Sequence, residues 1–182
     1  MKPDKTDEQL LDEFLAGDRK ALAELARRYE RPLLGLAGGL LGGRRDLACD
    51  AVQETWLRVI RFGRQFMGHS SFKTWLYRIG INQCRSLQRA CVTLAAGGAI
   101  EDMPSSEIPP EQAVQSADQN HTLRRAVERL GSDKRLVVLL CYHSGMTHEQ
   151  AADILEIPLG TLKSRLHAAL TELRSALSAE AN

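Results

Sequence analysis

The sequence lacks the features that mark several easily recognised classes of protein. Aromatic residues make up only 5% of its 182 residues, and the formal net charge at pH 7 is +1. No apolar run is long enough to span a bilayer, and the N-terminal stretch MKPDKTDEQ has no signal-peptide character, so we expect a cytoplasmic protein without stable membrane insertion. The small net charge excludes nucleic-acid binding through a global basic excess, so any such function must depend on local segregation of charge.

Metal-binding and disulfide patterns are missing as well. The histidines are dispersed without an HExxH motif, and the cysteines form no CxxC pair. We therefore expect no metal site, no cofactor and no enzymatic activity, and stoichiometric zinc or iron in the purified protein would contradict this. We interpret the following residues as reduced, buried thiols: Cys49, Cys84, Cys91 and Cys141.

Apolar residues recur at helical spacing along most of the chain, and no segment shows sustained strand alternation. The sequence therefore predicts an all-α fold of two small helical domains, residues 1–91 and 122–182. Residues 92–121 contain Gly97-Gly98, Pro109-Pro110 and several carboxylates but no Lys or Arg. That composition is typical of a flexible acidic linker.

The stretch MTHEQAADILEIPLGTLKSRLHAAL, residues 146–170, predicts a helix-turn-helix. Thr147 and Gln150 have capping-box spacing, and Pro158 suits the start of the second helix. Glu156 occupies a turn position where Gly is usual, so we expect mild strain from a positive φ. The alternative is an ordinary helical hairpin with a solvated charged face. The following side chains on the second helix suit base edges and phosphates in a major groove: Thr161, Lys163, Ser164, Arg165 and His167.

A second segregation of charge lies on the helix predicted over residues 72–89. The wheel projection places Trp75 and Ile81 beside a polar face, with Phe72 and Leu76 opposite. Cations that track phosphates, next to an aromatic ring that stacks on bases, suit single-stranded nucleic acid. A solvated helix face with Trp75 half-buried explains the pattern equally well. The polar face consists of Arg78, Asn82, Arg85 and Arg89.

The helix predicted from Asp46 to Phe62 carries a polar patch of Asp50, Gln53 and Glu54 next to apolar residues. The patch could dock a protein partner, but the pattern by itself favours an ordinary amphipathic core helix.

Several segments together resemble the extracytoplasmic-function (ECF) group of bacterial sigma factors, in the sigma-70 family. They are DAVQETWLRVIRF at residues 50–62, FMGHSSFKTWLYRIGINQCRSLQR at residues 66–89, and the helix-turn-helix with PLGTLKSRLHAAL at residues 158–170. The order and spacing of these blocks are more specific than any one of them.

The resemblance implies a sigma factor that directs core RNA polymerase to promoters and assists DNA melting. It implies that Asp50, Gln53, Glu54 and Arg58 bind the polymerase. It implies that minus-ten DNA is bound by Phe66, His69, Ser70, Ser71, Lys73, Trp75, Arg78, Asn82 and Arg85. Minus-thirty-five DNA would be read by the five polar residues of the second motif helix. The implied partners are core polymerase, promoter DNA and an anti-sigma factor, which could hold the chain at the inner membrane; we expect a monomer when the chain is free.

The main alternative is a stand-alone helix-turn-helix regulator with an N-terminal sensor domain. Such regulators commonly bind two-fold operators as dimers. The sequence has no long heptad seam to support a dimer. Tight binding of duplex DNA without polymerase would favour this alternative.

Overall fold

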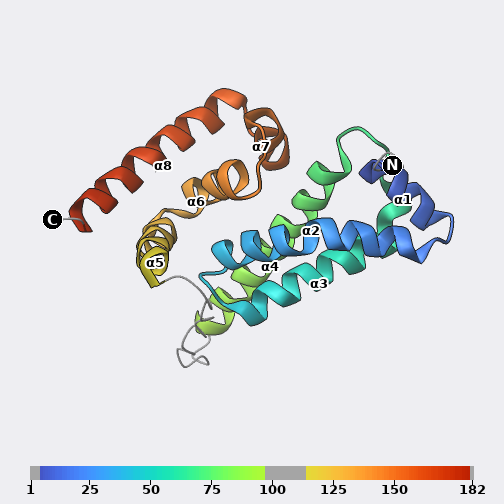
Figure 1. Cartoon of the computed structure of the whole chain (residues 1–182), viewed down its shortest axis with the longest axis horizontal. Helices are drawn as coiled ribbons and strands as arrows, with labels where there is room; N and C mark the ends of the chain where they lie inside the picture. The colour runs from blue at the N-terminus through green and yellow to red at the C-terminus, as the bar shows by residue number, and fades with distance from the viewer. Residues whose placement is uncertain (1–4, 97–113, 181–182) are drawn as a thin grey trace.

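The structure, a computed structural model, describes residues 5–96 and 114–180, with side chains for 5–93 and 122–179. Regular structure in these ranges is helical throughout, which confirms the predicted all-α class (Figure 1). The N-terminal domain consists of α1 (Asp7–Leu15), α2 (Arg19–Leu40), α3 (Arg45–Phe62), the short 3-10 helix η1 (Gly63–Gln65) and α4 (Phe72–Ala96). The C-terminal domain consists of α5 (Val114–Arg129), α6 (Ser132–Val138), the π-helical turn η2 (Leu139–His143), α7 (His148–Leu155) and α8 (Leu159–Glu180).

Local sequence signals determine several helix starts. At α1, the Oγ1 atom of Thr6 accepts from the Gln9 amide at 3.2 Å, and Oε1 of Gln9 accepts from the Thr6 amide at 3.0 Å. Thr147 and Gln150 form the same capping box at α7, and the Asp18 side chain caps α2. These contacts satisfy amides that have no acceptor inside the helix, and the box at α7 confirms the one predicted from the spacing of Thr147 and Gln150.

The N-terminal core lies where α3 packs against both α2 and α4. Leu25, Val59, Phe72 and Leu76 are completely buried there. Burying one such side chain contributes about 1.5–3 kcal/mol. Because α3 uses one side for this core, its opposite side remains available to partners.

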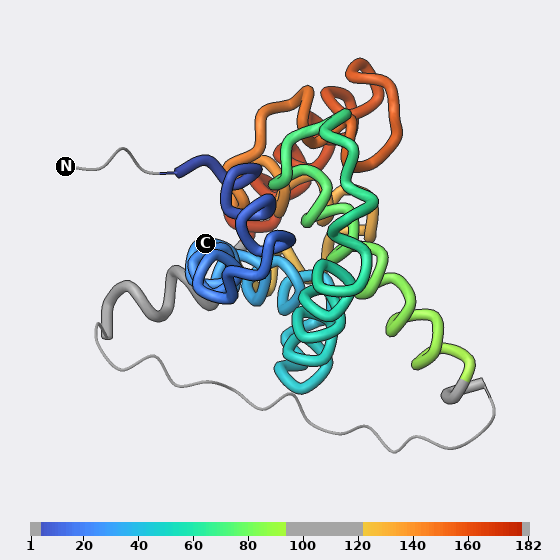
Figure 2. Tube along the Cα trace, turned by 90° about the vertical axis from the view of Figure 1, so that its right-hand side faces the viewer, coloured from blue at the N-terminus to red at the C-terminus, as the bar shows by residue number. Residues whose placement is uncertain are grey.

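The C-terminal helices α6 and α7 lie against one side of the N-terminal domain (Figures 1 and 2). Glycines on α2 permit the close approach. A Cβ atom added at Gly35 would lie 2.1 Å from Nε2 of His143, and one at Gly39 would lie 2.9 Å from Cδ1 of Leu139. Because Gly35 and Gly39, one turn apart on α2, have no side chains, η2 packs directly on the backbone of α2.

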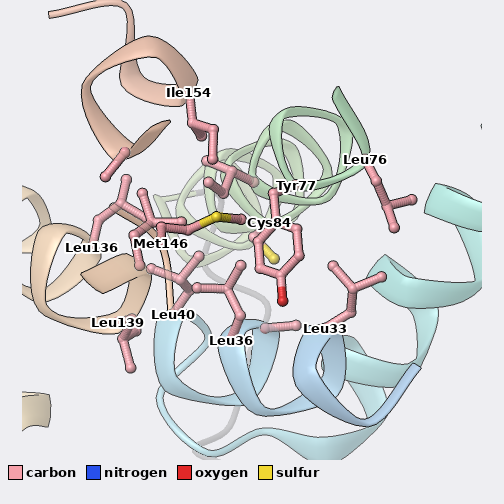
Figure 3. Packing of buried hydrophobic residues seen from close by; sticks show 14 of the residues in the cluster. Leu33, Leu36, Leu40, Leu76, Tyr77, Cys84, Leu136, Leu139, Met146 and Ile154 are labelled. Carbon is pink, nitrogen blue, oxygen red and sulfur yellow. The ribbon is translucent and has the colours of Figure 1, made fainter. Parts of the chain in front are cut away.

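Buried side chains from the two domains also meet. Leu36 and Leu40 of α2 approach Leu139 of η2, with Met146 and Ile154 nearby (Figure 3). Leu36 is 1% exposed and Met146 is 4% exposed. The apolar core is therefore continuous across the boundary between the domains.

The helices extend into the range predicted as linker. α4 continues to Ala96 and α5 begins at Val114. The end of α4, VTLAA, and the start of α5, VQSADQNH, contain neither Gly nor Pro, so nothing in them interrupts a helix. The glycines and prolines that motivated the linker prediction fall within residues 97–113, outside the described residues.

Candidate nucleic-acid interfaces

The outer face of α4 carries the predicted polar stripe. Asn82, Arg85 and Arg89 are exposed, whereas the side chain of Arg78 is only 33% exposed. Ile81, expected at the edge of this stripe, is instead 2% exposed. It follows buried Tyr77 by one turn and precedes buried Cys84, so the covered side of α4 is wider than its apolar pattern suggests. This helix contacts α7 as well as α2 and α3, which accounts for the extra coverage.

Trp75 is half-buried in a cluster of aromatic rings. Its ring centroid lies 5.3 Å from that of Phe66 and 6.0 Å from that of Phe72, both at interplanar angles of 50°. Tyr29 of α2 meets Phe72 edge-on at 6.0 Å. Tilted and edge-on pairs of this kind are favourable. Trp75 is therefore partly packed against two rings, as the solvated-face alternative expected, and the part that stays exposed is compatible with stacking on a base.

The loop of residues 66–71 connects η1 to α4. His69 and Ser71 are exposed, whereas Ser70 and Phe66 are half-buried. The side chain with the greatest exposure among the described large apolar residues also lies here: Met67, at 75%. Sequence reasoning did not single out Met67, although an apolar residue between Phe66 and a glycine in a polar loop was a usable signal.

Two cations of the α4 surface contact the C-terminal domain. Nζ of Lys73 donates to the carbonyl oxygens of Ser144, at 3.1 Å, and Gly145, at 3.5 Å. Burial lowers the pKa of this Lys73 ammonium. The sequence pattern placed Lys73 beside the loop but contained no sign of these acceptors, which lie more than 70 positions away along the chain.

Arg78 is held more extensively. Its Nη2 atom donates to the backbone oxygen of Asp153 at 2.8 Å and lies 3.3 Å from the Oδ1 atom of the same residue. Nε of Arg78 lies 3.9 Å from a carboxylate oxygen of Glu156. The guanidinium of Arg78, which was predicted to bind DNA, therefore contacts a backbone carbonyl and two carboxylates of α7 and its turn.

The helix α3 presents the predicted polar patch beside two grooves. Asp50, Gln53 and Arg58 are exposed, and Nε of Arg58 pairs with Oε1 of Glu54 at 3.1 Å. Gln53 and Leu57 line both grooves and so form the ridge between them. The groove toward α4 has a volume of about 320 Å³, and Asp50, Glu54, Gln83, Ser86 and Leu87 are among its lining residues.

The groove toward α2, with a volume of about 310 Å³, is mainly apolar. Ile60, 47% exposed, and Trp56 lie along it. The indole nitrogen of Trp56 is buried without a hydrogen-bond partner within the described structure. A ridge flanked by grooves is a surface on which another helix can interdigitate.

The predicted helix-turn-helix is formed by α7 and α8. Glu156 at the turn has φ 56°, which confirms the expected left-handed conformation at this non-glycine residue. Leu162 and Leu166 of α8 are buried against the domain. The exposed side of α8 begins within its first turns, where Lys163, Ser164 and His167 are exposed and Thr161 is half-buried.

Arg165 differs from its neighbours on α8. Its Nη2 atom forms an ion pair with Oδ2 of Asp133 on α6 at 3.0 Å, and 35% of the side chain is exposed. The Ser164 hydroxyl donates to the Thr161 carbonyl at 2.9 Å, so it is oriented along the helix. The five predicted residues are therefore brought together on one end of α8, with Arg165 anchored by the adjacent helix.

The described residues contain neither a cluster of His, Cys, Asp and Glu that could hold a metal ion nor a helix suited to crossing a membrane. Burial raises the pKa of the Cys84 thiol to about 11. Cys49, in contrast to the expectation for buried thiols, is exposed on α3.

Comparisons with known proteins match two separate parts of the chain. The family model for Sigma-70 region 2 matches residues 25–90, and that for Sigma-70, region 4 matches residues 120–173. The ECF RNA polymerase sigma-E factor of Escherichia coli (strain K12) is 28% identical over 180 residues, covering 91% of each chain. The RNA polymerase sigma-H factor of Pseudomonas aeruginosa is 27% identical, covering 97% of this chain and 96% of the relative.

Solved structures share the fold. CnrH, solved in complex with the cytosolic domain of CnrY, aligns with a TM-score of 0.74 at 22% identity, over 96% of this chain and 99% of the other. The sigma factor RpoE of Bartonella quintana, solved with the anti-sigma factor NepR, aligns with a TM-score of 0.72 at 24% identity, over 87% of this chain and 98% of the other. The two family models follow each other in order, one on each helical domain, and relatives named as ECF RNA polymerase sigma factors align over more than nine-tenths of their length: the chain belongs to the sigma-70 family of RNA polymerase sigma factors, in its ECF group.

Proposed function

We propose that this chain directs bacterial core RNA polymerase to specific promoters and assists the melting of DNA there. The observation that carries the proposal is the match of both sigma-70 regions, each on a domain with cations on one helix, α4 or α8. The alternative, a stand-alone regulator, requires a sensor domain at the position where the region 2 model matches.

The polymerase-binding surface in this proposal is the outer side of α3. The Gln53–Leu57 ridge supplies shape, and Asp50, Glu54 and Arg58 supply charge around it. A helical element of the polymerase inserted along the groove toward α2 would bury Ile60. Apolar grooves bounded by charged residues are typical of protein interfaces.

The surface for melted DNA comprises the 66–71 loop and the outer face of α4. Phe66, His69, Ser70 and Ser71 belong to the loop. Lys73, Trp75, Arg78, Asn82 and Arg85 follow on the helix. An accessible aromatic side beside cations supports this role, because base stacking on aromatic side chains contributes about 1–3 kcal/mol per base.

The start of α8 is the duplex-reading surface in the proposal. Thr161, Ser164 and the cationic Lys163 and Arg165 lie in its first turns, with His167 one turn later. A recognition helix enters the major groove with its N-terminal residues toward base edges. Because Asp133 anchors Arg165, that guanidinium either reaches DNA in its anchored orientation or exchanges partners on binding.

The proposal also includes a protein partner. CnrH and RpoE were solved in complexes with the cytosolic domain of CnrY and the anti-sigma factor NepR, respectively. We propose that an anti-sigma factor binds this chain in the cytoplasm.

The test of the proposed function is transcription by core polymerase with and without the chain, on a library of promoter fragments. We expect co-purification with core polymerase and enrichment of transcripts from a small set of fragments. Properly folded protein that fails to bind core polymerase, yet binds duplex DNA tightly as a dimer, would favour the stand-alone regulator instead.

A further inference from the structure

The junction between the 66–71 loop and α4 is held by a residue of α1. The backbone N–H of Phe72, the first residue of α4, donates to Oε1 of Glu8 at 2.8 Å. The first amides of a helix have no acceptor within it, and a carboxylate beside them is favourable electrostatically. The amide of Thr74 donates to Oγ of Ser71 at 3.1 Å. One cap is therefore local, and the other comes from a residue 64 positions earlier in the chain.

The backbone around Glu8 is itself well anchored. The adjacent Asp7 carboxylate accepts from Nη1 of Arg28 at 2.8 Å and also from the Tyr29 hydroxyl. Leu10 is 4% exposed and Leu11 is 1% exposed, so α1 is fixed to the domain by its apolar side. A carboxylate on such a helix can restrain the amide that it binds.

The other end of the loop also rests on α1. A Cβ atom added at Gly63 would lie 3.3 Å from Cδ2 of Leu15 and 3.4 Å from Cδ1 of Leu11. Nη2 of Arg64 donates to the Leu15 carbonyl at 3.5 Å. Between the two ends, Met67 is 75% exposed and Gly68 has φ 70°, so the middle of the loop has little packing of its own.

We propose that Glu8 is a positioning residue for single-stranded DNA: by holding the first amide of α4, it fixes the direction in which the loop presents its side chains to an unpaired base. The proposal rests on the function proposed above and adds a residue outside every surface assigned there. Its physical basis is preorganisation, since a loop already held in its binding conformation loses less conformational entropy when it binds.

The test uses the full chain assembled with core polymerase. Single strands are first selected by the wild-type complex from a fluorescently labelled random pool, and their affinity for variants is then measured by anisotropy. We expect Glu8→Ala to bind the selected strands about three- to tenfold more weakly, because a hydrogen bond to a charged group is lost at a partly exposed site. Glu8→Gln should recover most of the affinity, since its amide oxygen still accepts a hydrogen bond.

Gln9→Ala is the matched control. Gln9 caps α1 at the same end through the Thr6 amide, at 3.0 Å, and is itself exposed. If Glu8 acted only by stabilising α1, Gln9→Ala would weaken strand binding to the same degree, and the proposal would be overturned. Affinity for core polymerase should stay unchanged in all three variants, because α3 is not involved.

A scan of abasic positions along the selected strand distinguishes positioning from general loss of structure. In wild type, one abasic position should reduce affinity most, where the loop captures a base. In Glu8→Ala, the loss of affinity caused by the abasic site at that position should be smaller than in wild type, while the losses at the other positions stay the same. This is the result expected if Glu8 and the captured base are energetically coupled. Uniform weakening, or strand binding equal to or tighter than wild type, would overturn the positioning role. Failure of the wild-type complex to select any strand would instead contradict the proposed function itself.

Discussion

At the scale of single residues, Arg165 is both a candidate contact to DNA and a partner in an ion pair within the protein. As a cation at the start of α8 it suits base edges or phosphates, yet its guanidinium already pairs with Asp133 at 3.0 Å. Anchoring by a neighbouring carboxylate restricts the rotamers of a long side chain, so the entropy lost on binding DNA is smaller. The same contact weakens the attraction to phosphates by local neutralisation. Direct contact with a base edge is the role that fits an anchored guanidinium best.

We predict that Arg165→Ala weakens closed-complex formation on duplex promoters by about 1–3 kcal/mol, with relaxed preference at one base position. Gel-shift titration of the polymerase complex on systematically varied duplexes measures both effects. Arg174→Ala is the control, since it removes an exposed cation farther along the same helix, beyond the residues matched by the region 4 model. Equal losses for both variants would mean that α8 contributes only general electrostatic attraction.

Trp75 is expected to act after duplex binding, because stacking requires an unpaired base. We predict that Trp75→Ala leaves closed-complex affinity nearly unchanged and impairs strand opening, measured by permanganate reactivity of unpaired thymines. Trp75→Phe keeps a ring against Phe66 and Phe72 and should retain more opening activity. If Trp75→Ala leaves the permanganate footprint at the wild-type level, its accessible side is not a stacking platform.

At the scale of elements, the turn between α7 and α8 contains a local conflict between sequence and backbone. Among the residues that the structure describes, Glu156 is the non-glycine residue with a positive φ, at 56°. A left-handed conformation is unfavourable for residues with a Cβ atom by roughly 1–2 kcal/mol. Part of this is offset at Glu156, whose amide caps the end of α7 through the carbonyls of Ala152 and Asp153.

We predict that Glu156→Gly stabilises the chain by about 1 kcal/mol, because glycine adopts this conformation without a steric penalty. For a chain of this size the melting temperature should rise by about 2–4 °C in calorimetry. Glu149→Gly, in the first turn of α7, is the control. It should lower the melting temperature, because glycine within a helix is unfavourable. A decrease with Glu156→Gly would show that the carboxylate near Arg78 matters more than the backbone.

Elements defined by neighbouring residues were predictable from sequence, and those defined by distant contacts were not. The capping boxes at Thr6 and Thr147 and the left-handed turn at Glu156 depend on spacings of a few residues. Ile81 was misplaced because its burial depends on how many helices pack around α4, which its periodicity does not encode. The α4 surface was recognisable as a cationic stripe, but the engagement of Arg78 was not.

At the scale of the whole molecule, the two domains face each other across the surface proposed to hold melted DNA. Lys73 donates to carbonyls before α7, and Arg78 contacts Asp153 and Glu156. The glycines on α2 that admit η2 make this packing close. The contacts of Arg78 with Asp153 compete with a strand for the same guanidinium, so we expect separation of the domains to favour strand binding.

We predict that Asp153→Lys shifts the free chain toward separated domains and increases its affinity for single-stranded DNA by about two- to fivefold. The size follows from the 0.2–1 kcal/mol that is typical of an exposed ion pair, increased at most modestly by repulsion between Lys and Arg78. Small-angle scattering should detect a larger radius of gyration at low ionic strength, and the difference should diminish with salt because the contact is partly exposed.

Added positive charge alone strengthens binding to DNA, so a control of equal charge is essential. Asp12→Lys provides it, because Asp12 is exposed on α1 and makes no ion pair described across the domain boundary. Asp153→Lys should exceed this control in strand binding by the free chain. Within the polymerase complex the advantage should vanish, since domains already separated no longer compete for Arg78. Equal affinities of the two free variants, together with equal radii of gyration, would mean that the Arg78–Asp153 contact does not control access to the strand-binding surface.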